Sequence, residues 1–258
     1  LNFFDDYQFE NYWIDTGQSS FLIEYAKKHE IIPEDIIGTC IKKSDLSVFE
    51  IENSPPTPFL FQGGYLTFKS KDYDLGYKLD YPNKEVRDSF SKLLLLGSYQ
   101  LEDEIYSRIS QTIKLALKER NFELIFSELK RIFSFIPYQL YQRKEGIYNK
   151  DDWKKLNENY YHTVILIVFH SCGLNVIGEE STNLGRSDIV LKFREDVYII
   201  EIKKTNADDA LEQIKEKEYY KKYEDTIGKE NNIFLVGISI DEEKRNLREY
   251  KIINLLKK

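Results

Sequence analysis

Two apolar segments joined by a short polar turn constrain the fold of this chain most strongly. SDIVLKF and VYIIEIKK alternate in the manner of strands and are joined by the polar turn REDV. Strands joined by so short a turn pair antiparallel, which brings Asp188 to the same end of the hairpin as Glu201 and Lys203. Side chains two residues apart share one face of a strand, so Glu201 and Lys203 point the same way. The sequence therefore predicts two carboxylates and one ammonium at one edge of a sheet.

The segments around this hairpin predict a compact α/β domain. A helix of about twenty residues ends at Gly173, and the short strand NVIGEE follows it. After the hairpin, a second helix begins at Asn206, a good N-cap residue, and the buried strand NIFLVGISI comes next. YKIINLL is a possible last strand. The order is αβββαβ, which predicts a compact α/β domain with a mixed sheet.

The first half of the chain predicts a different architecture. FLIEYAKKH and IIPEDIIG indicate short helices, FLFQGG indicates a helix ended by glycines, and YLTFKS and LGYKLDY indicate a hairpin. A helix beginning at Pro82 and Asn83 and amphipathic helices over 100–136 follow. We expect a helical, winged-helix-like region over 1–136 and the α/β domain over 137–258, separated by YQLYQRKEGIYNK. The overall fold class is α+β.

Composition limits the classes of protein to consider. No stretch approaches the roughly 18 apolar residues of a membrane helix, and the acidic, aromatic N-terminus is not a signal peptide. Two distant cysteines indicate reduced thiols, so we expect a cytoplasmic protein. The net charge of −7 argues against tight non-specific binding to phosphates, although a local basic groove stays open. The absence of Met suggests a fragment or a processed chain.

An E-x-K triplet occurs four times in the sequence, and the four copies differ in the segments that surround them. Glu128/Lys130 lies mid-helix, Glu242/Lys244 in a charged loop and Glu249/Lys251 before an apolar run. Only Glu201/Lys203 ends an apolar strand that has an aspartate beside it. Carboxylates are the hard oxygen ligands that suit Mg²⁺ or Mn²⁺, and a lysine there could orient an attacking water or stabilise negative charge.

The spacing G-R-S-D, twelve residues, E-I-K resembles the PD-(D/E)xK nuclease superfamily. The likeness is closest to the C-terminal nuclease domain of bacterial proteins that combine an AAA-ATPase-like part with a nuclease. It extends over nearly the whole chain, through ENYWIDTG, PFLFQGGYLTF, YPNKEVRDSF, ENYYH, TNLGRSDIVL, YIIEIK and ALEQIKEKEYYKKY. The resemblance implies a restriction-endonuclease-like fold for the α/β domain and a Mg²⁺- or Mn²⁺-dependent nuclease acting on DNA. Its active-site core would be Asp188, Glu201 and Lys203, with Glu158 as a further metal ligand and Gln213 as an auxiliary polar residue.

The chain departs from that family in one respect. The ATPase part of such proteins carries a phosphate-binding loop, and this sequence has no GxxxxGK[ST]. We therefore expect no ATP site here, and an ATPase domain outside this sequence as a possible partner. The oligomeric state stays open.

Each candidate residue also has a simpler interpretation. Glu201 and Lys203 alone could be a surface ion pair, and Glu158 a solvated helix residue. His162 is more often a packed or capping histidine than a metal or substrate contact.

Three residues are candidate contacts to nucleic acid: Arg186, Lys204 and Tyr220. Arg186 could equally brace its loop, and the pair Tyr219–Tyr220 more often packs on a sheet than stacks on bases. The alternative function is a catalytically inactive module that binds nucleic acid or protein. RNA as the substrate is a further possibility.

Overall fold

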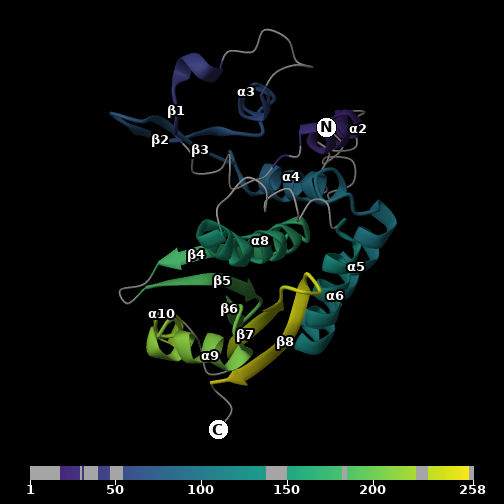
Figure 1. Cartoon of the computed structure of the whole chain (residues 1–258), viewed down its shortest axis with the longest axis vertical. Coiled ribbons are helices and arrows are strands. Elements are labelled where there is room, and N and C mark those ends of the chain that lie inside the picture. Colours follow the sequence, from purple (N-terminus) through teal and green to yellow (C-terminus); the bar gives the residue numbers. More distant parts are fainter. Residues whose placement is uncertain are drawn as a thin grey trace. The chain divides into compact units, whose positions relative to one another are not determined.

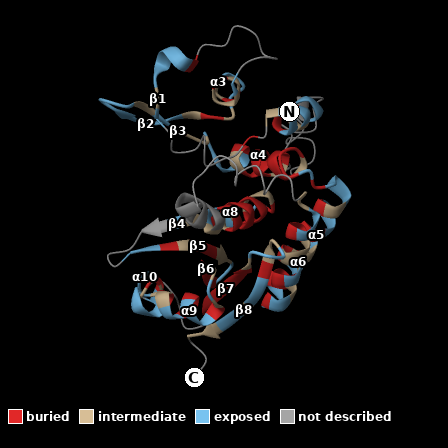
Figure 2. Cartoon of the chain, viewed as in Figure 1, coloured by how far each residue is buried: buried red, intermediate tan, exposed pale blue. Residues whose placement is uncertain are grey.

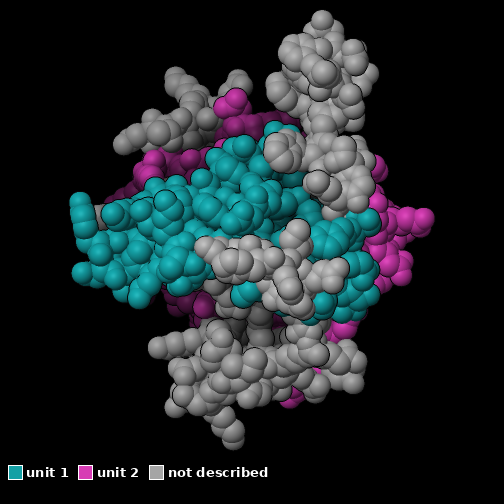
Figure 3. Space-filling view, turned by 90° about the horizontal axis from the view of Figure 1, so that it is seen from above, with its two compact units in different colours: residues 1–100 teal, residues 101–258 magenta. Residues whose placement is uncertain are grey.

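The chain divides into two compact units, Leu1–Gln100 and Leu101–Lys258, shown in different colours in Figure 3. The computed structural model describes residues 18–29, 31, 40–46, 55–137, 150–181, 185–224 and 232–255 (Figure 1). The expected helix at IIPEDIIG, the motif ENYWIDTG and most of the connector YQLYQRKEGIYNK lie outside these residues. No helix in the described ranges is long and apolar enough to cross a membrane.

Unit 1 combines helices with a small antiparallel sheet. Its described elements are α2 (Gln18–His29), β1 (Cys40–Ile41), the 3₁₀ helix η2 (Lys43–Leu46), α3 (Pro56–Gln62), β2 (Thr67–Asp72), β3 (Gly76–Asp80) and α4 (Lys84–Leu96). The strand order is β1-β3-β2, so the hairpin expected from YLTFKS and LGYKLDY is confirmed. Asn83 caps α4 by accepting a hydrogen bond from the Val86 amide. The winged-helix-like character of this region stays a prediction.

Unit 2 contains the expected α/β sequence of elements. Its described elements are α5 (Asp103–Lys118), α6 (Phe122–Phe135), α8 (Lys150–Ser171), β4 (Asn175–Ser181), β5 (Arg186–Phe193), β6 (Asp196–Lys203), α9 (Ala207–Glu216), α10 (Lys221–Glu224), β7 (Ile233–Asp241) and β8 (Asn246–Asn254). The strands lie in the order β4-β5-β6-β7-β8. Only β6 and β7 pair in parallel, so the sheet is mixed as predicted.

Helices cover both faces of the five-stranded sheet (Figure 1). On one face, Leu211 and Ile214 of α9 pack against Val190, Ile199 and Leu235 of the central strands. The other face carries α8, whose second half is largely buried (Figure 2). Every residue of β6 except Lys203 is buried, so this strand is the centre of the core. The charged pair that ends β6 therefore projects from the middle of the sheet.

The two compact units meet between residues 100 and 101, and the expected domain boundary between 136 and 137 stays a prediction. The two amphipathic helices α5 and α6 belong to unit 2. α6 packs beside β8, where the rings of Phe126 and Tyr250 are 4.8 Å apart and the Asn246 side chain donates to the Lys130 carbonyl. The apolar stripe of α6 is buried as expected, but it packs against the nuclease-like sheet.

The helix expected over 206–223 is two helices. Asn206 caps α9 by accepting from the Asp209 amide, as predicted. The helix ends at Glu216, because Glu218 has a φ of 49°, in the left-handed region that does not continue an α-helix. The short α10 follows, and Tyr219 and Tyr223 from this segment pack on the sheet.

Candidate active site

Asp188 and Glu201 meet where the β5–β6 hairpin opens. The two strands pair with Ile189 opposite Ile200, so the next position along the ladder places Asp188 beside Glu201. The Asp188 amide donates to Glu201 Oε2 at 3.4 Å, and the Ile202 amide donates to Asp188 Oδ2 at 2.8 Å. A side-chain carboxylate thus replaces a backbone carbonyl as the partner of Ile202. This exchange holds both acidic side chains at one end of the sheet, as the hairpin pattern predicted.

Glu201 is held on several sides. Its side chain is only 1% exposed, and Gln213 Nε2 on α9 donates to Oε1. The Lys203 ammonium lies 3.4 Å from the same oxygen and is 27% exposed, so it reaches from the carboxylate toward solvent. The surface ion pair considered from sequence is therefore replaced by a pair in which one partner is buried.

A glycine allows α9 to approach this site. Gly237 of β7 is the neighbour of Glu201 across the parallel pair. A Cβ at Gly237 would lie 2.2 Å from the Ala207 carbonyl oxygen and 3.1 Å from Ala210 Cβ. Only a residue without a side chain fits there, and the close packing that results brings Gln213 to Glu201.

Burial makes the ionised form of both carboxylates unfavourable. Burial, with repulsion from Asp188, raises the pKa of Glu201 to about 8, and the Lys203 ammonium opposes that shift. Burial also raises the pKa of Asp188, while its hydrogen bond from Ile202 acts in the opposite direction. A cation bound between these groups would relieve both effects.

Two side chains of α8 reach the backbone at this same end of the sheet. Glu158 Oε1 accepts from the Lys204 amide at 3.2 Å, and His162 Nε2 lies 2.9 Å from the Asp188 carbonyl oxygen. Glu158 is near enough for its charge to raise the pKa of Asp188. All five residues expected at the site, Glu158, Asp188, Glu201, Lys203 and Gln213, are thus connected through hydrogen bonds, ion pairs or electrostatic interactions.

The donor set fits a divalent cation held by few protein ligands. Among the described residues, no group of three or more His, Cys, Asp or Glu side chains is placed to hold a metal ion, so Glu158 does not form a three-carboxylate set with Asp188 and Glu201. Mg²⁺ commonly binds through one or two carboxylates and keeps several waters. Asp188 and Glu201 supply two, and Asp188 Oδ1 accepts no hydrogen bond from the residues that the structure describes. Glu158 lies beside them, and its Oε1 is used by Lys204.

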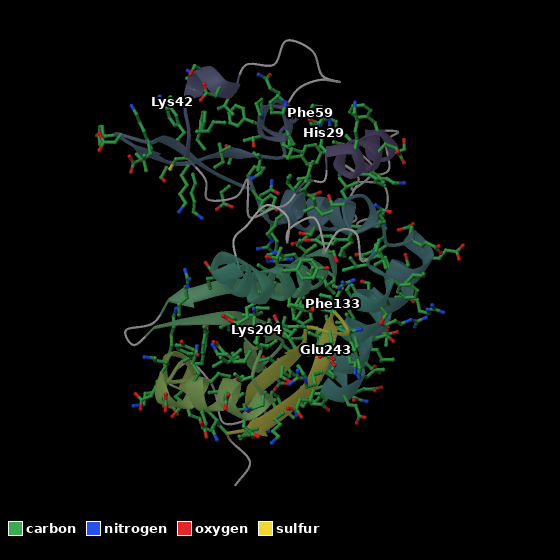
Figure 4. All side chains as sticks on the ribbon, in the orientation of Figure 1. His29, Lys42, Phe59, Phe133, Lys204 and Glu243 are labelled. Carbon is green, nitrogen blue, oxygen red and sulfur yellow. The ribbon has the colours of Figure 1, made fainter. Side chains whose placement is uncertain are left out.

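The three expected nucleic-acid contacts have different surroundings. Arg186 is 59% exposed and pairs with Glu179 at 3.1 Å. Lys204, labelled in Figure 4, is 18% exposed and pairs with Glu242 at 3.2 Å. Tyr220 is partly buried against the core cluster under α9. Tyr219 is buried, which agrees with the packing interpretation of this tyrosine.

Sequence reasoning missed two contributions to the site. The contact of His162 with the Asp188 backbone was not foreseen, although Glu158 and His162 stand four residues apart and so share a helix face. The role of Gly237 was missed as well. A glycine inside an apolar strand pattern is a signal of close backbone approach, and it was available in NIFLVGISI.

Comparison with known proteins agrees with this site. Residues 156–250 match the profile of the PD-(D/E)XK nuclease superfamily. The matched stretch begins within α8, ends within β8 and contains every candidate site residue. Residues 156–250 of unit 2 are therefore similar to PD-(D/E)XK nuclease superfamily domains, in agreement with the resemblance inferred from the spacing of the acidic residues and lysine.

One relative resembles the chain over nearly its whole length. An uncharacterized protein in the vnfD 5′ region of Azotobacter chroococcum mcd 1 is 28% identical over 267 aligned residues, which cover 99% of this chain and 48% of that protein. The chain thus spans about half the length of this curated relative. No solved structure matches the chain. Neither match shows an ATPase-associated family context.

Proposed function

We propose that this chain contains a metal-dependent nuclease that hydrolyses phosphodiester bonds of DNA. The observation that carries the proposal is the meeting of Asp188 and Glu201 at the end of two buried strands, with Lys203 3.4 Å from Glu201. The superfamily match over residues 156–250 supports the same class of reaction.

Asp188 and Glu201 would hold Mg²⁺ or Mn²⁺, and Glu158 would assist them. The bound cation would supply a Lewis acid that polarises the phosphate and lowers the pKa of water. Lys203 reaches outward from Glu201, so its ammonium can orient the attacking water and stabilise the negative charge that develops on the phosphate. Gln213 fixes the rotamer of Glu201 through its hydrogen bond to Oε1.

The finer parts of the proposal concern the surroundings of the domain. The resemblance to ATPase-linked nucleases suggests an ATPase module as a partner, and the greater length of the relative leaves room for one. Arg186 would meet the DNA backbone, since it is the most exposed of the three candidate contacts. A DNA substrate would place this activity in the cytoplasm.

A cleavage assay with paired variants tests the proposal. Linear, circular and single-stranded DNA and an RNA of the same sequence are incubated with the protein in Mg²⁺, Mn²⁺ or EDTA. We expect cleavage of DNA that requires the metal and is lost in Lys203→Ala. The matched control is Lys251→Ala, which removes the lysine of another E-x-K triplet in the same sheet, where it pairs with Asp208. Cleavage in EDTA, or equal activity of the two variants, contradicts the mechanism.

A second candidate is a binding module without catalysis. Two of the three candidate nucleic-acid contacts, Arg186 and Lys204, are paired with carboxylates, which reduces the positive charge available to DNA and favours a module that binds protein. Calorimetric titration with Mn²⁺ separates the candidates. Binding that is lost in Asp188→Asn supports the nuclease, and absence of binding at millimolar Mn²⁺ supports the module.

A further inference from the structure

One face of α8 contacts the backbone of both strands that carry the candidate site. Glu158 and His162 are one helical turn apart. Glu158 accepts from the amide of Lys204, directly after Lys203 at the end of β6, and His162 contacts the carbonyl of Asp188 on β5. The two contacts therefore hold the exit of one strand and the start of the other.

His162 must be the donor in its hydrogen bond to the Asp188 carbonyl. A backbone carbonyl can only accept, so His162 Nε2 carries the proton and donates it at 2.9 Å. Asp188 makes two further hydrogen bonds at the site. Its backbone amide donates to Glu201, and its carboxylate accepts from the Ile202 amide. A shift of the Asp188 backbone would therefore disturb both acidic side chains together.

The neighbouring packing fixes the position of the imidazole. At Gly178 of β4, a Cβ would lie 2.8 Å from Leu166 and 3.5 Å from His162 Nε2. α8 therefore lies directly on β4 at this point, and the ring of His162 passes the glycine to reach the next strand.

We infer that His162 is a positioning residue, which sets the place of the Asp188 carboxylate relative to Glu201. The inference rests on the proposed function for its consequence, because that separation determines how the two carboxylates share a cation. It adds to the site a residue whose effect passes through the backbone of Asp188. Groups that orient metal ligands in this way typically change metal affinity by about 10- to 100-fold when they are removed.

The chain offers a closely matched control on the same helix. His170 of α8 also places its Nε2 near a strand carbonyl, that of Val176 on β4, at 3.4 Å. It lies about two turns farther along the helix, and its strand contact is to β4 and not to β5 or β6. Loss of either imidazole removes a similar helix-to-sheet contact, but only His162 touches Asp188.

The experiment compares His162→Leu, His162→Gln and His170→Leu with the wild-type protein. The first readout is the exchange rate of the Ile202 amide by NMR in metal-free buffer, because this amide is bound to Asp188 Oδ2. The second is the dissociation constant for Mn²⁺ by calorimetry. Thermal melting of each variant reports how much general stability is lost.

We expect His162→Leu to speed exchange at Ile202 and weaken Mn²⁺ binding by about 10- to 100-fold. His162→Gln retains an N–H donor and should recover part of both, while His170→Leu should change neither beyond its loss of stability. Equal Ile202 exchange in the two leucine variants, or Mn²⁺ affinity unchanged in His162→Leu, overturns the inference. A wild-type protein that binds no Mn²⁺ contradicts the proposed function, and the Ile202 comparison still decides whether His162 positions Asp188.

Discussion

Two E-x-K triplets lie on the same face of one sheet and differ in almost everything except sequence. Glu201 and Lys203 end β6, and Glu249 and Lys251 lie on β8, with β7 between them. Gly237 of β7 pairs with Glu201 on one side and Lys251 on the other. The two triplets are therefore separated by a single strand and both face α9.

The difference lies in burial and in the partners. Glu249 is exposed, accepts from the Ala207 amide at the start of α9, and is followed by Lys251, which pairs with Asp208 at 2.5 Å. A carboxylate there stabilises the positive end of a helix. Glu201 is buried beside a second carboxylate, where its charge is unfavourable until a cation arrives. The same three-letter pattern thus stabilises a helix in one place and forms a candidate metal site in the other.

The sharpest test of this comparison is loss of one carboxylate charge in each triplet. Glu201→Gln should lower metal-dependent DNA cleavage by at least about 100-fold, because it removes a ligand of the cation that stabilises the transition-state charge. Glu249→Gln should leave the cleavage rate unchanged. Initial rates in saturating Mn²⁺ measure both. Similar losses in the two variants would show that the triplets do not differ in function.

The sequence alone predicted the core of this comparison. A short turn fixes the register of a hairpin, so the meeting of Asp188 and Glu201 follows from local geometry. The cap at Asn206 is equally local. The neighbours of Arg186 and the reach of His162 depend on contacts between elements far apart in the chain, which periodicity does not encode.

The packing partner of α6 illustrates the same limit. The apolar stripe of α6 correctly predicted a buried face, but such a stripe is the same whichever layer covers it. The structure pairs that face with β8, at Phe126 and Tyr250, and α5 and α6 lie in the compact unit that carries the site.

The strand between the triplets provides the next prediction. Gly237→Ala should destabilise the protein by about 1–3 kcal/mol, because the added methyl group meets the rigid Ala207 carbonyl at 2.2 Å. Gly178→Ala is the control, since its methyl group meets a flexible leucine side chain at 2.8 Å and should cost less. Urea unfolding measures both. A smaller cost at Gly237 than at Gly178 would contradict the close packing of α9 beside the site.

The pH dependence of stability should distinguish the triplets without any catalysis. The folded-state pKa of Glu201 lies above its ordinary value of 4.5, so the metal-free protein binds a proton that the unfolded chain releases. Its contribution to stability is complete below pH 4.5 and is lost as the pH rises toward about 8. The slope from this group is at most about 1.4 kcal/mol per pH unit.

Glu201→Gln should remove that contribution, and Glu249→Gln should not. The comparison is made by urea unfolding at several pH values between 4.5 and 8 in EDTA. Added Mn²⁺ should reduce the loss of stability in the wild-type protein at the upper end of this range. A slope equal in the wild-type and Glu201→Gln proteins would show that Glu201 ionises as easily when folded as when unfolded.

The smallest expected effect concerns the two lysines. At pH 9 without metal, Lys203→Ala should cost less than the about 3–5 kcal/mol of breaking a fully buried pair, because it leaves the Glu201 carboxylate without its nearest cation but Lys203 is itself 27% exposed. Lys251→Ala removes a partner of Asp208 from an exposed ion pair, where solvent and salt already screen the interaction, so its melting temperature should match that of the wild type. Raising the salt concentration should leave the difference between the two variants largely intact, because the Glu201 carboxylate is out of reach of mobile ions. If 1 M salt abolishes the difference, the β6 triplet behaves as a surface pair and its contrast with the β8 triplet is lost.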